Sequence, residues 1–108
     1  MIMYSKSVVY RFTSFTSAKI VAGHCTESLS KFVVKLDMSS LTITVSKESE
    51  VNISATFEDI ENLKKFDDAL AKFVVELREA FDFRENNKSS VCVFSYQRDT
   101  SVDTLELN

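Results

Sequence analysis

The sequence predicts an α+β domain in which an antiparallel sheet of about five to six strands is covered on one face by one long amphipathic helix. Three observations lead to this prediction. Residues 57–81 carry apolar side chains at helical spacing, residues 41–45 and 51–56 alternate between apolar and polar side chains, and further apolar runs lie on both sides of the helix. The predicted order is β-β-β-β-β-α-β-β, in a single domain over residues 1–108.

Five strands are predicted before the helix. Residues 8–13 and 31–36 show the period-two alternation of half-buried strands. Residues 41–45 and 51–56 show it too, and the five polar residues between them predict that these two strands pair as a hairpin. Residues 18–22 form a weaker strand candidate.

The predicted helix covers residues 57–81. Thr56 followed by Asp59 resembles a capping box, and acidic residues in the first turn favour the positive end of the helix dipole. The helix should end in a polar loop over residues 82–90. Its apolar stripe consists of Ile60, Leu63, Phe66, Leu70, Phe73, Val74, Leu77 and Phe81.

Two strands are predicted after the helix. Residues 91–96 are apolar on both faces, which is typical of an interior strand, and residues 102–107 could return beside them. One face of the sheet would then bury its apolar side chains under the helix. The other face would carry Thr, Ser, Asn, Lys and Arg side chains.

Composition argues against several kinds of catalytic site. The chain has one glycine and no proline, so the Gly-rich loops that hold nucleotide phosphates cannot form. His24 is the only histidine, and Cys25 beside it supplies at most two of the ligands that a zinc site needs. A pair of Cys92 with His24 would still need oxyanion donors, which are usually built from glycine loops or helix termini. We therefore expect no enzyme activity, no metal and no cofactor.

The chain has the composition of an ordinary globular protein, with 44% apolar and 27% charged residues. No run is long enough to cross a membrane, and the first residues lack the basic segment and apolar block of a secretory leader. We expect a cytoplasmic protein whose two cysteines stay reduced.

Charge is distributed unevenly along the chain. Residues 1–47 hold six basic and two acidic residues, for a net +4, whereas residues 48–108 hold seven basic and fourteen acidic residues, for a net −7. If the early strands lie together, the polar face of the sheet carries Arg11, Lys31 and Lys35. Such an electrostatic dipole favours oriented docking onto a charged partner and could equally stabilise self-association.

The outward side of the predicted helix is a second candidate surface. Helical geometry places Val75 there, where an isolated exposed valine hints at a contact surface. Its charged neighbours on that side are Asp68, Lys72 and Glu79.

These surfaces favour a non-enzymatic protein-binding module, of the small and compact kind that phages and mobile elements use to inhibit host proteins. A polar sheet face, a charged helix face and open strand edges can each bind another protein. We expect a protein partner and no membrane association. The same surfaces would serve a homo-oligomer.

Two alternatives remain. In the first, an oligomer binds a nucleotide-like anion, which Arg11, Lys31 and Lys35 would hold while Tyr10 or Tyr96 stacks on the base. In the second, the protein binds or mimics nucleic acid. The pI near 5.1 and the sparse basic residues, which are not interleaved with exposed aromatic side chains, disfavour nucleic-acid binding.

Overall fold

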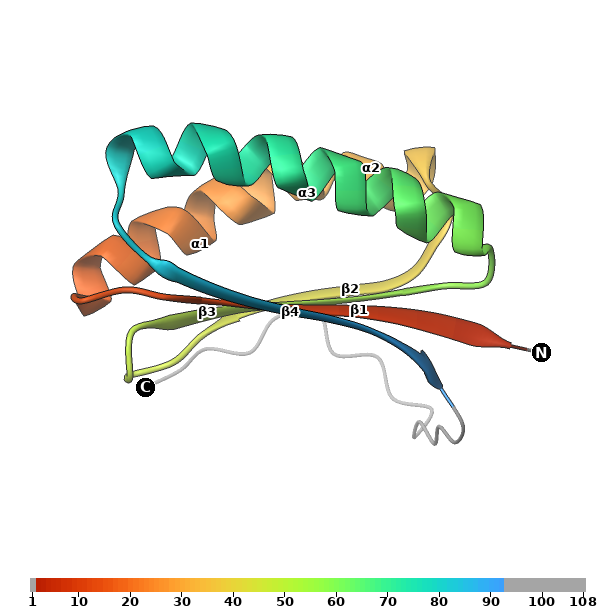
Figure 1. Ribbon diagram of the computed structural model, residues 1–108, viewed down its shortest axis with the longest axis horizontal. Helices are drawn as coiled ribbons and strands as arrows, with labels where there is room; N and C mark the ends of the chain where they lie inside the picture. Colours follow the sequence, from red (N-terminus) through yellow and green to blue (C-terminus); the bar gives the residue numbers. More distant parts are fainter. Residues whose placement is uncertain (1, 93–108) are drawn as a thin grey trace.

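The computed structural model describes residues 2–92, which form a four-stranded antiparallel sheet with helices on one face (Figure 1). The strand order across the sheet is β2-β3-β1-β4. The elements in chain order are β1 (Met3–Arg11), α1 (Phe15–Leu29), α2 (Phe32–Lys35), β2 (Met38–Val45), β3 (Glu50–Phe57), α3 (Ile60–Ala80) and β4 (Arg84–Cys92). The α+β class and the antiparallel sheet are therefore confirmed.

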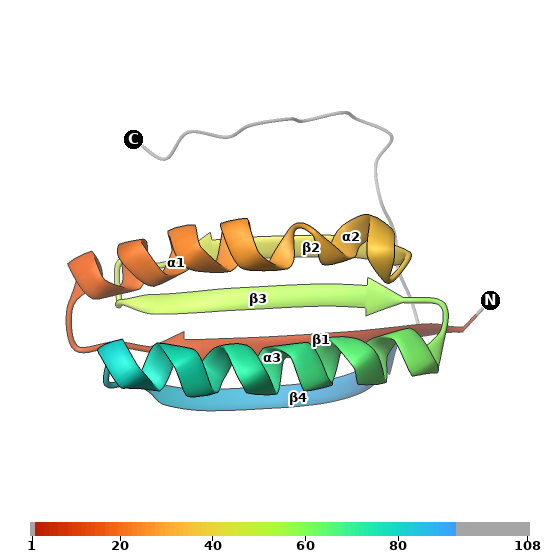
Figure 2. The same cartoon turned by 90° about the horizontal axis from the view of Figure 1, so that it is seen from above.

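The two central strands form the inner layer of the core. In the β1–β3 register Val8 lies opposite Ile53, and Tyr10 lies opposite Val51. All four side chains are buried, because they point toward the helices. The helix layer covers them in two halves: α1 packs on β2 and β3, and α3 packs on β1 and β3 (Figure 2).

The predicted hairpin is confirmed as β2 and β3. Its turn is closed by the Ser46 amide, which donates to the Glu50 carbonyl at 2.9 Å. Ser49 adopts a φ of 65°, in the left-handed region that glycine usually occupies. The chain thus makes this turn with a serine and without its single glycine, Gly23.

The long predicted helix is confirmed as α3, with a later start. The helix begins at Ile60, and the Asp59 carboxylate caps it by accepting from the Glu61 amide at 2.9 Å. Thr56 lies in β3, where its hydroxyl contacts the Ser40 hydroxyl at 2.6 Å, so the predicted capping box is wrong. The strand continues past Thr56 because Phe57 is still paired with Tyr4 and is buried.

Two predicted strands are helices instead, so the prediction of a single helix is wrong. Residues 18–22 lie within α1, whose N-cap Ser14 accepts from the Ser17 amide at 3.1 Å. Residues 31–36 contain the short helix α2. The buried side of α1 is formed by Ala18, Val21, Cys25 and Leu29, a helical spacing that becomes visible only over about three turns.

The end of the described chain also differs from the prediction. Residues 84–90, expected in a loop, belong to β4, which pairs with β1 along its full length. Val91 belongs to the same edge strand and is exposed, so the prediction that an interior strand begins at Val91 is wrong. Residues 93–96 and the predicted strand 102–107 lie outside the described residues. The described sheet therefore has four strands and not five to six.

Candidate functional site

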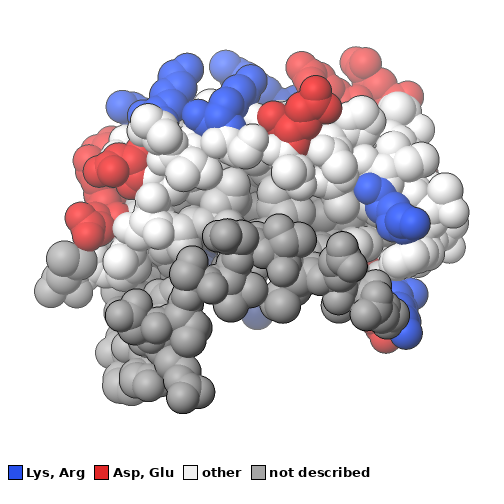
Figure 3. Space-filling view, turned by 180° about the vertical axis from the view of Figure 1, so that it is seen from behind, with Lys and Arg blue, Asp and Glu red and all other residues white. Residues whose placement is uncertain are grey.

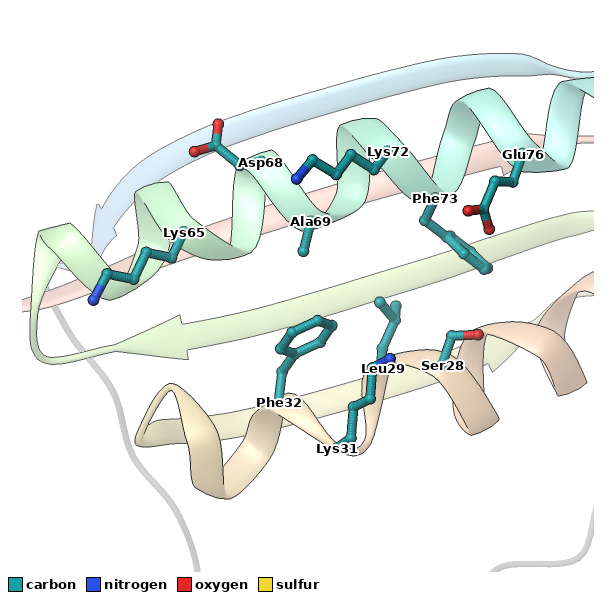
Figure 4. A pocket seen from close by; sticks show the side chains of 10 residues that line it. All are labelled: Ser28, Leu29, Lys31, Phe32, Lys65, Asp68, Ala69, Lys72, Phe73 and Glu76. Carbon is teal, nitrogen blue, oxygen red and sulfur yellow. The ribbon is translucent and has the colours of Figure 1, made fainter.

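A groove of about 460 Å³ runs between α1–α2 and α3 on the outer side of the helix layer (Figure 4). It forms because α1 ends at Leu29 and the chain turns through Ser30 into α2, which brings Phe32 opposite the middle of α3. Residues far apart in the sequence thus line one depression.

The walls of the groove are apolar. Leu29 and Phe32 point into it from one side, and Ala69 and Phe73 point into it from the other (Figure 4). Leu29 is buried, whereas Phe32, Ala69 and Phe73 are only half-buried. The Phe32 ring is held edge-on against Phe66, with the ring centroids 6.4 Å apart. The groove therefore has a fixed aromatic wall that remains partly open to solvent.

Three exposed lysines, Lys31, Lys65 and Lys72, line the groove beside these walls. Within residues 2–92, none of them has a carboxylate within 4.0 Å. Glu61, one turn before Lys65 on α3, pairs with Lys64 at 3.4 Å instead.

Two carboxylates, Asp68 and Glu76, also line the groove, so its charge is mixed with a positive excess. The ammonium of Lys31 lies 5.4 Å from the Phe32 ring centroid. The ammonium of Lys35, outside the lining, lies 5.9 Å from the same centroid. These cation–π contacts place positive charge next to the aromatic wall.

The predicted binding residues are spread over three places. Lys31, Asp68 and Lys72 line the groove, and Lys35 lies beside it on Phe32. Val75 lies on the outward side of α3 and is 64% exposed. Glu79, near the end of the same helix, is also exposed.

Arg11 lies apart from these residues, on the face of the sheet opposite the helices. Its Nε donates to Glu50 at 2.9 Å. The expectation that Arg11 shares a polar sheet face with Lys31 and Lys35 is therefore wrong. The physical reason is that residues 31–36 join the helix layer and not the sheet.

The side of the molecule that carries α1 and β2 shows how these charges are arranged. Basic and acidic side chains both stand along the top of this view, the basic ones mainly toward the left and the acidic ones toward the right, and much of the described surface below them is uncharged (Figure 3). β2 itself has no charged residue between Met38 and Val45.

A buried ion pair, which the sequence analysis missed, joins the sheet to α3. Lys6 on β1 is 7% exposed, and its Nζ lies 2.7 Å from Oδ1 of Asp67 and 3.4 Å from Oδ1 of Asn87. Together with Glu85 these groups line a hollow of about 250 Å³ between α3 and β4. The available signal was the strand period, because Lys6 occupies the same inward phase as Val8.

The environment of Cys25 disfavours the reactive thiolate form of its side chain. Burial raises the pKa of the Cys25 thiol to about 12, so the thiol stays protonated, and His24 beside it is exposed. Tyr10 is fully buried, so its predicted stacking on a ligand base is wrong; Tyr96 lies outside the described residues. Burial, and to a lesser extent the Glu85 carboxylate, raises the pKa of Tyr10 well above its usual value.

The described chain contains neither a cluster of metal ligands nor a membrane-spanning helix. In residues 2–92 no three His, Cys, Asp or Glu side chains are grouped closely enough to hold a metal ion. None of α1, α2 and α3 combines the length and the apolar character that a membrane-spanning helix requires.

Comparison with known proteins identifies the fold. The sequence matches no protein-family model and no curated protein. A dimeric ferredoxin-like protein from an uncultured marine organism matches with a TM-score of 0.72 and 17% identity, over 89% of this chain and 99% of that chain. A second dimeric ferredoxin-like protein, also from an uncultured marine organism, matches with a TM-score of 0.70 and 9% identity, over 89% and 100%.

A third match, with a TM-score of 0.69 and 8% identity, is a protein of unknown function from Nitrosomonas europaea; it covers 91% of this chain and 97% of that chain. A NIPSNAP family protein from Agrobacterium tumefaciens matches with a TM-score of 0.52 and 11% identity, over 86% and 93%. At these identities the likeness concerns the fold alone. The chain therefore has a ferredoxin-like α+β fold.

Proposed function

We propose that this chain is a non-enzymatic protein-binding module that associates with a second copy of itself through the face of its sheet that α1, α2 and α3 leave uncovered, here called the open face. The observation that carries the proposal is the one-sided packing: α1, α2 and α3 all lie on the same face (Figure 1). The description of two matched structures as dimeric supports it.

The composition of the open face suits a protein interface. Its middle is built from small polar residues of the two central strands, where Ser5 lies opposite Thr56 and Ser7 lies opposite Ser54. Each hydroxyl both donates and accepts a hydrogen bond, so it can pair with a symmetry-related copy of this face. The centres of protein interfaces are likewise depleted in charged residues.

The ionised groups of this face lie toward its margin. Arg11, Glu50 and Arg84 form one row at the end of β1, and Lys88 lies on the edge strand β4. Arg11 and Glu50 neutralise each other within the subunit. A second copy could therefore cover the middle of the face without burying an unpaired charge.

The molar mass in solution tests the proposal. Light scattering coupled to gel filtration should give a dimer for the wild type and a monomer for a Ser7→Arg, Ser54→Arg double variant, because symmetry brings the added charges together. Ser30→Arg, on an exposed residue of the helix layer, is the matched control and should remain dimeric. A monomeric wild type, or a dimer that survives the double variant, would contradict the proposal.

The non-enzymatic part of the proposal is supported by the burial of the Cys25 thiol, which keeps it protonated. No feature of residues 2–92 supports the inhibitor role or the phage setting expected from the sequence, so we propose neither.

Small-ligand binding is a second candidate function. The specific observation in its favour is the groove between α1–α2 and α3, where exposed lysines border an aromatic wall. This groove lies on the helix side of the sheet and stays accessible when the open face is covered.

A further inference from the structure

The geometry points to the groove between α1–α2 and α3 as a binding site for a small anion that carries a flat apolar ring, such as a nucleoside monophosphate or an aryl phosphate. Its volume of about 460 Å³ lies within the range of roughly 300–1,000 Å³ that is usual for small-molecule sites. The inference is independent of self-association, which would use the opposite side of the sheet.

The walls define the apolar part of the ligand. Phe32 and Phe73 face the groove from opposite sides and both remain half-buried (Figure 4). A flat ring entering between the walls would cover apolar surface on both. Aromatic side chains favour stacked or edge-on contacts with such a ring, and the T-shaped contact with Phe66 holds Phe32 in place for this.

The lysines define the anionic part. Lys31, Lys65 and Lys72 have no counter-ion within residues 2–92, so their ammonium groups are available to an external anion. Ammonium groups on flexible stems are common phosphate ligands. Because the Lys31 ammonium lies 5.4 Å from the Phe32 ring centroid, the fitting ligand carries its negative charge close to its ring.

The other hollows in the described chain lack this combination. The hollow of about 330 Å³ beside Arg11 and Arg84 has basic side chains, but no aromatic residue lines it and Arg11 is already paired with Glu50. The hollow between α3 and β4 holds a lysine that is already paired with Asp67. A further hollow, of about 350 Å³, has Arg11 and Arg84 beside Phe12 and Phe83, but both of these rings are buried. Of these four hollows, the interhelical groove is the one that joins unpaired ammonium groups to half-buried aromatic rings.

Calorimetric titration of the full chain with matched probes tests both parts of the ligand. AMP and phenyl phosphate should bind, because each has a ring and a phosphate. Adenosine lacks the phosphate and inorganic phosphate lacks the ring, so each should bind at least about tenfold more weakly. Raising the salt concentration should weaken AMP binding, since the lysines are exposed.

Variants on α3 locate the site. Lys65→Gln and Lys72→Gln should each weaken AMP binding several-fold, whereas Glu76→Gln should tighten it because it removes a carboxylate that repels the phosphate. Lys64→Gln is the matched control: Lys64 is adjacent to Lys65, pairs with Glu61 and does not line the groove, so affinity should be unchanged. All four positions are exposed, and an unchanged melting temperature will confirm folding.

Three results would overturn the inference. The first is an inorganic phosphate affinity equal to that of AMP, or an equal loss in Lys64→Gln and Lys65→Gln, which would indicate non-specific attraction of anions. The second is the absence of heat with every probe. The third is a polyglutamate peptide that binds in the groove in preference to AMP, which would make the occupant an acidic protein segment.

Discussion

The ammonium nitrogen of Lys6 lies 2.7 Å from a carboxylate oxygen of Asp67, and this ion pair ties the central strand β1 to the middle of α3. Lys6 is 7% exposed, whereas about a third of the Asp67 side chain reaches solvent. The pair thus sits at the border of the core, where a charge that loses its partner is poorly hydrated.

Asp67→Asn should therefore destabilise the protein by about 1–3 kcal/mol, because it leaves the Lys6 ammonium buried without a counter-ion; the partial exposure of Asp67 keeps the loss below that of a fully buried pair. The double variant Lys6→Met, Asp67→Leu should be more stable than Asp67→Asn. Urea unfolding at a fixed protein concentration measures both.

Glu61→Gln, which breaks the exposed pair with Lys64, is the control and should change stability by less than about 1 kcal/mol. Equal losses in the two single variants would contradict this role.

The cap of α3 gives a second prediction. Asp59→Ala removes the acceptor of the Glu61 amide and should cost about 1 kcal/mol of unfolding free energy. Asp68→Ala, at an exposed position within the same helix, should have almost no effect. Chemical denaturation compares the two, and a similar loss in both would argue against Asp59 as the cap.

The raised pKa of Cys25 predicts that the stability of the protein depends on pH. Its folded pKa of about 12 exceeds the value of about 8.5 expected in the unfolded chain, so the unfolded state releases a proton first as the pH rises. Stability should thus be unaffected by Cys25 below about pH 8 and should decline above about pH 8.5. Cys25→Ala should flatten the decline between about pH 8.5 and 9.5, which denaturant unfolding over this pH range will measure.

The same burial predicts slow thiol chemistry. In a Cys92→Ser background, Cys25 is the one remaining cysteine. It should react with a thiol reagent at pH 8 only through unfolding of the protein, because the thiolate is disfavoured and the side chain is buried. The labelling rate should rise on adding denaturant. Rapid labelling of the folded chain would contradict the buried position.

Replacing Tyr10, unlike replacing Asp67 or Asp59, should not destabilise the protein. Its hydroxyl is buried and has no hydrogen-bond partner among the described residues. Tyr10→Phe should therefore be neutral or stabilise the protein by up to about 1 kcal/mol, because it removes an unsatisfied polar group while keeping the ring contact with Phe83. Tyr4→Phe, at a half-buried position on the same strand, is the control and should be neutral. A loss above about 1 kcal/mol in Tyr10→Phe would indicate that the hydroxyl has a partner.

Local periodicity was enough to predict α3, the β2–β3 hairpin and residues 8–11 of β1, since each buries one face and therefore repeats its apolar residues at the period of its own geometry. α1 was harder to predict because its buried residues are spaced over about three turns, and residues 18–22 alone resemble a strand. α2 is a single helical turn. Such a short segment does not allow the 3.6-residue period of a helix to be distinguished from the two-residue period of a strand.

β4 could be recognised only in the folded molecule. Residues Arg84 to Val91 are all exposed, because they form the edge strand and α3 lies over its neighbour β1. No apolar alternation is required of such a strand, so its sequence resembles a loop. Backbone pairing with β1, which depends on no particular side chain, makes it a strand.

The lysines were visible in the sequence as charges, but their convergence was not. Lys31 and Lys72 are 41 positions apart, and they line one groove because α1–α2 and α3 pack side by side on the sheet. Local sequence determines which helix face is polar, through the 3.6-residue period. Which polar faces meet, and whether a lysine finds a carboxylate or an open groove beside it, follows from long-range packing.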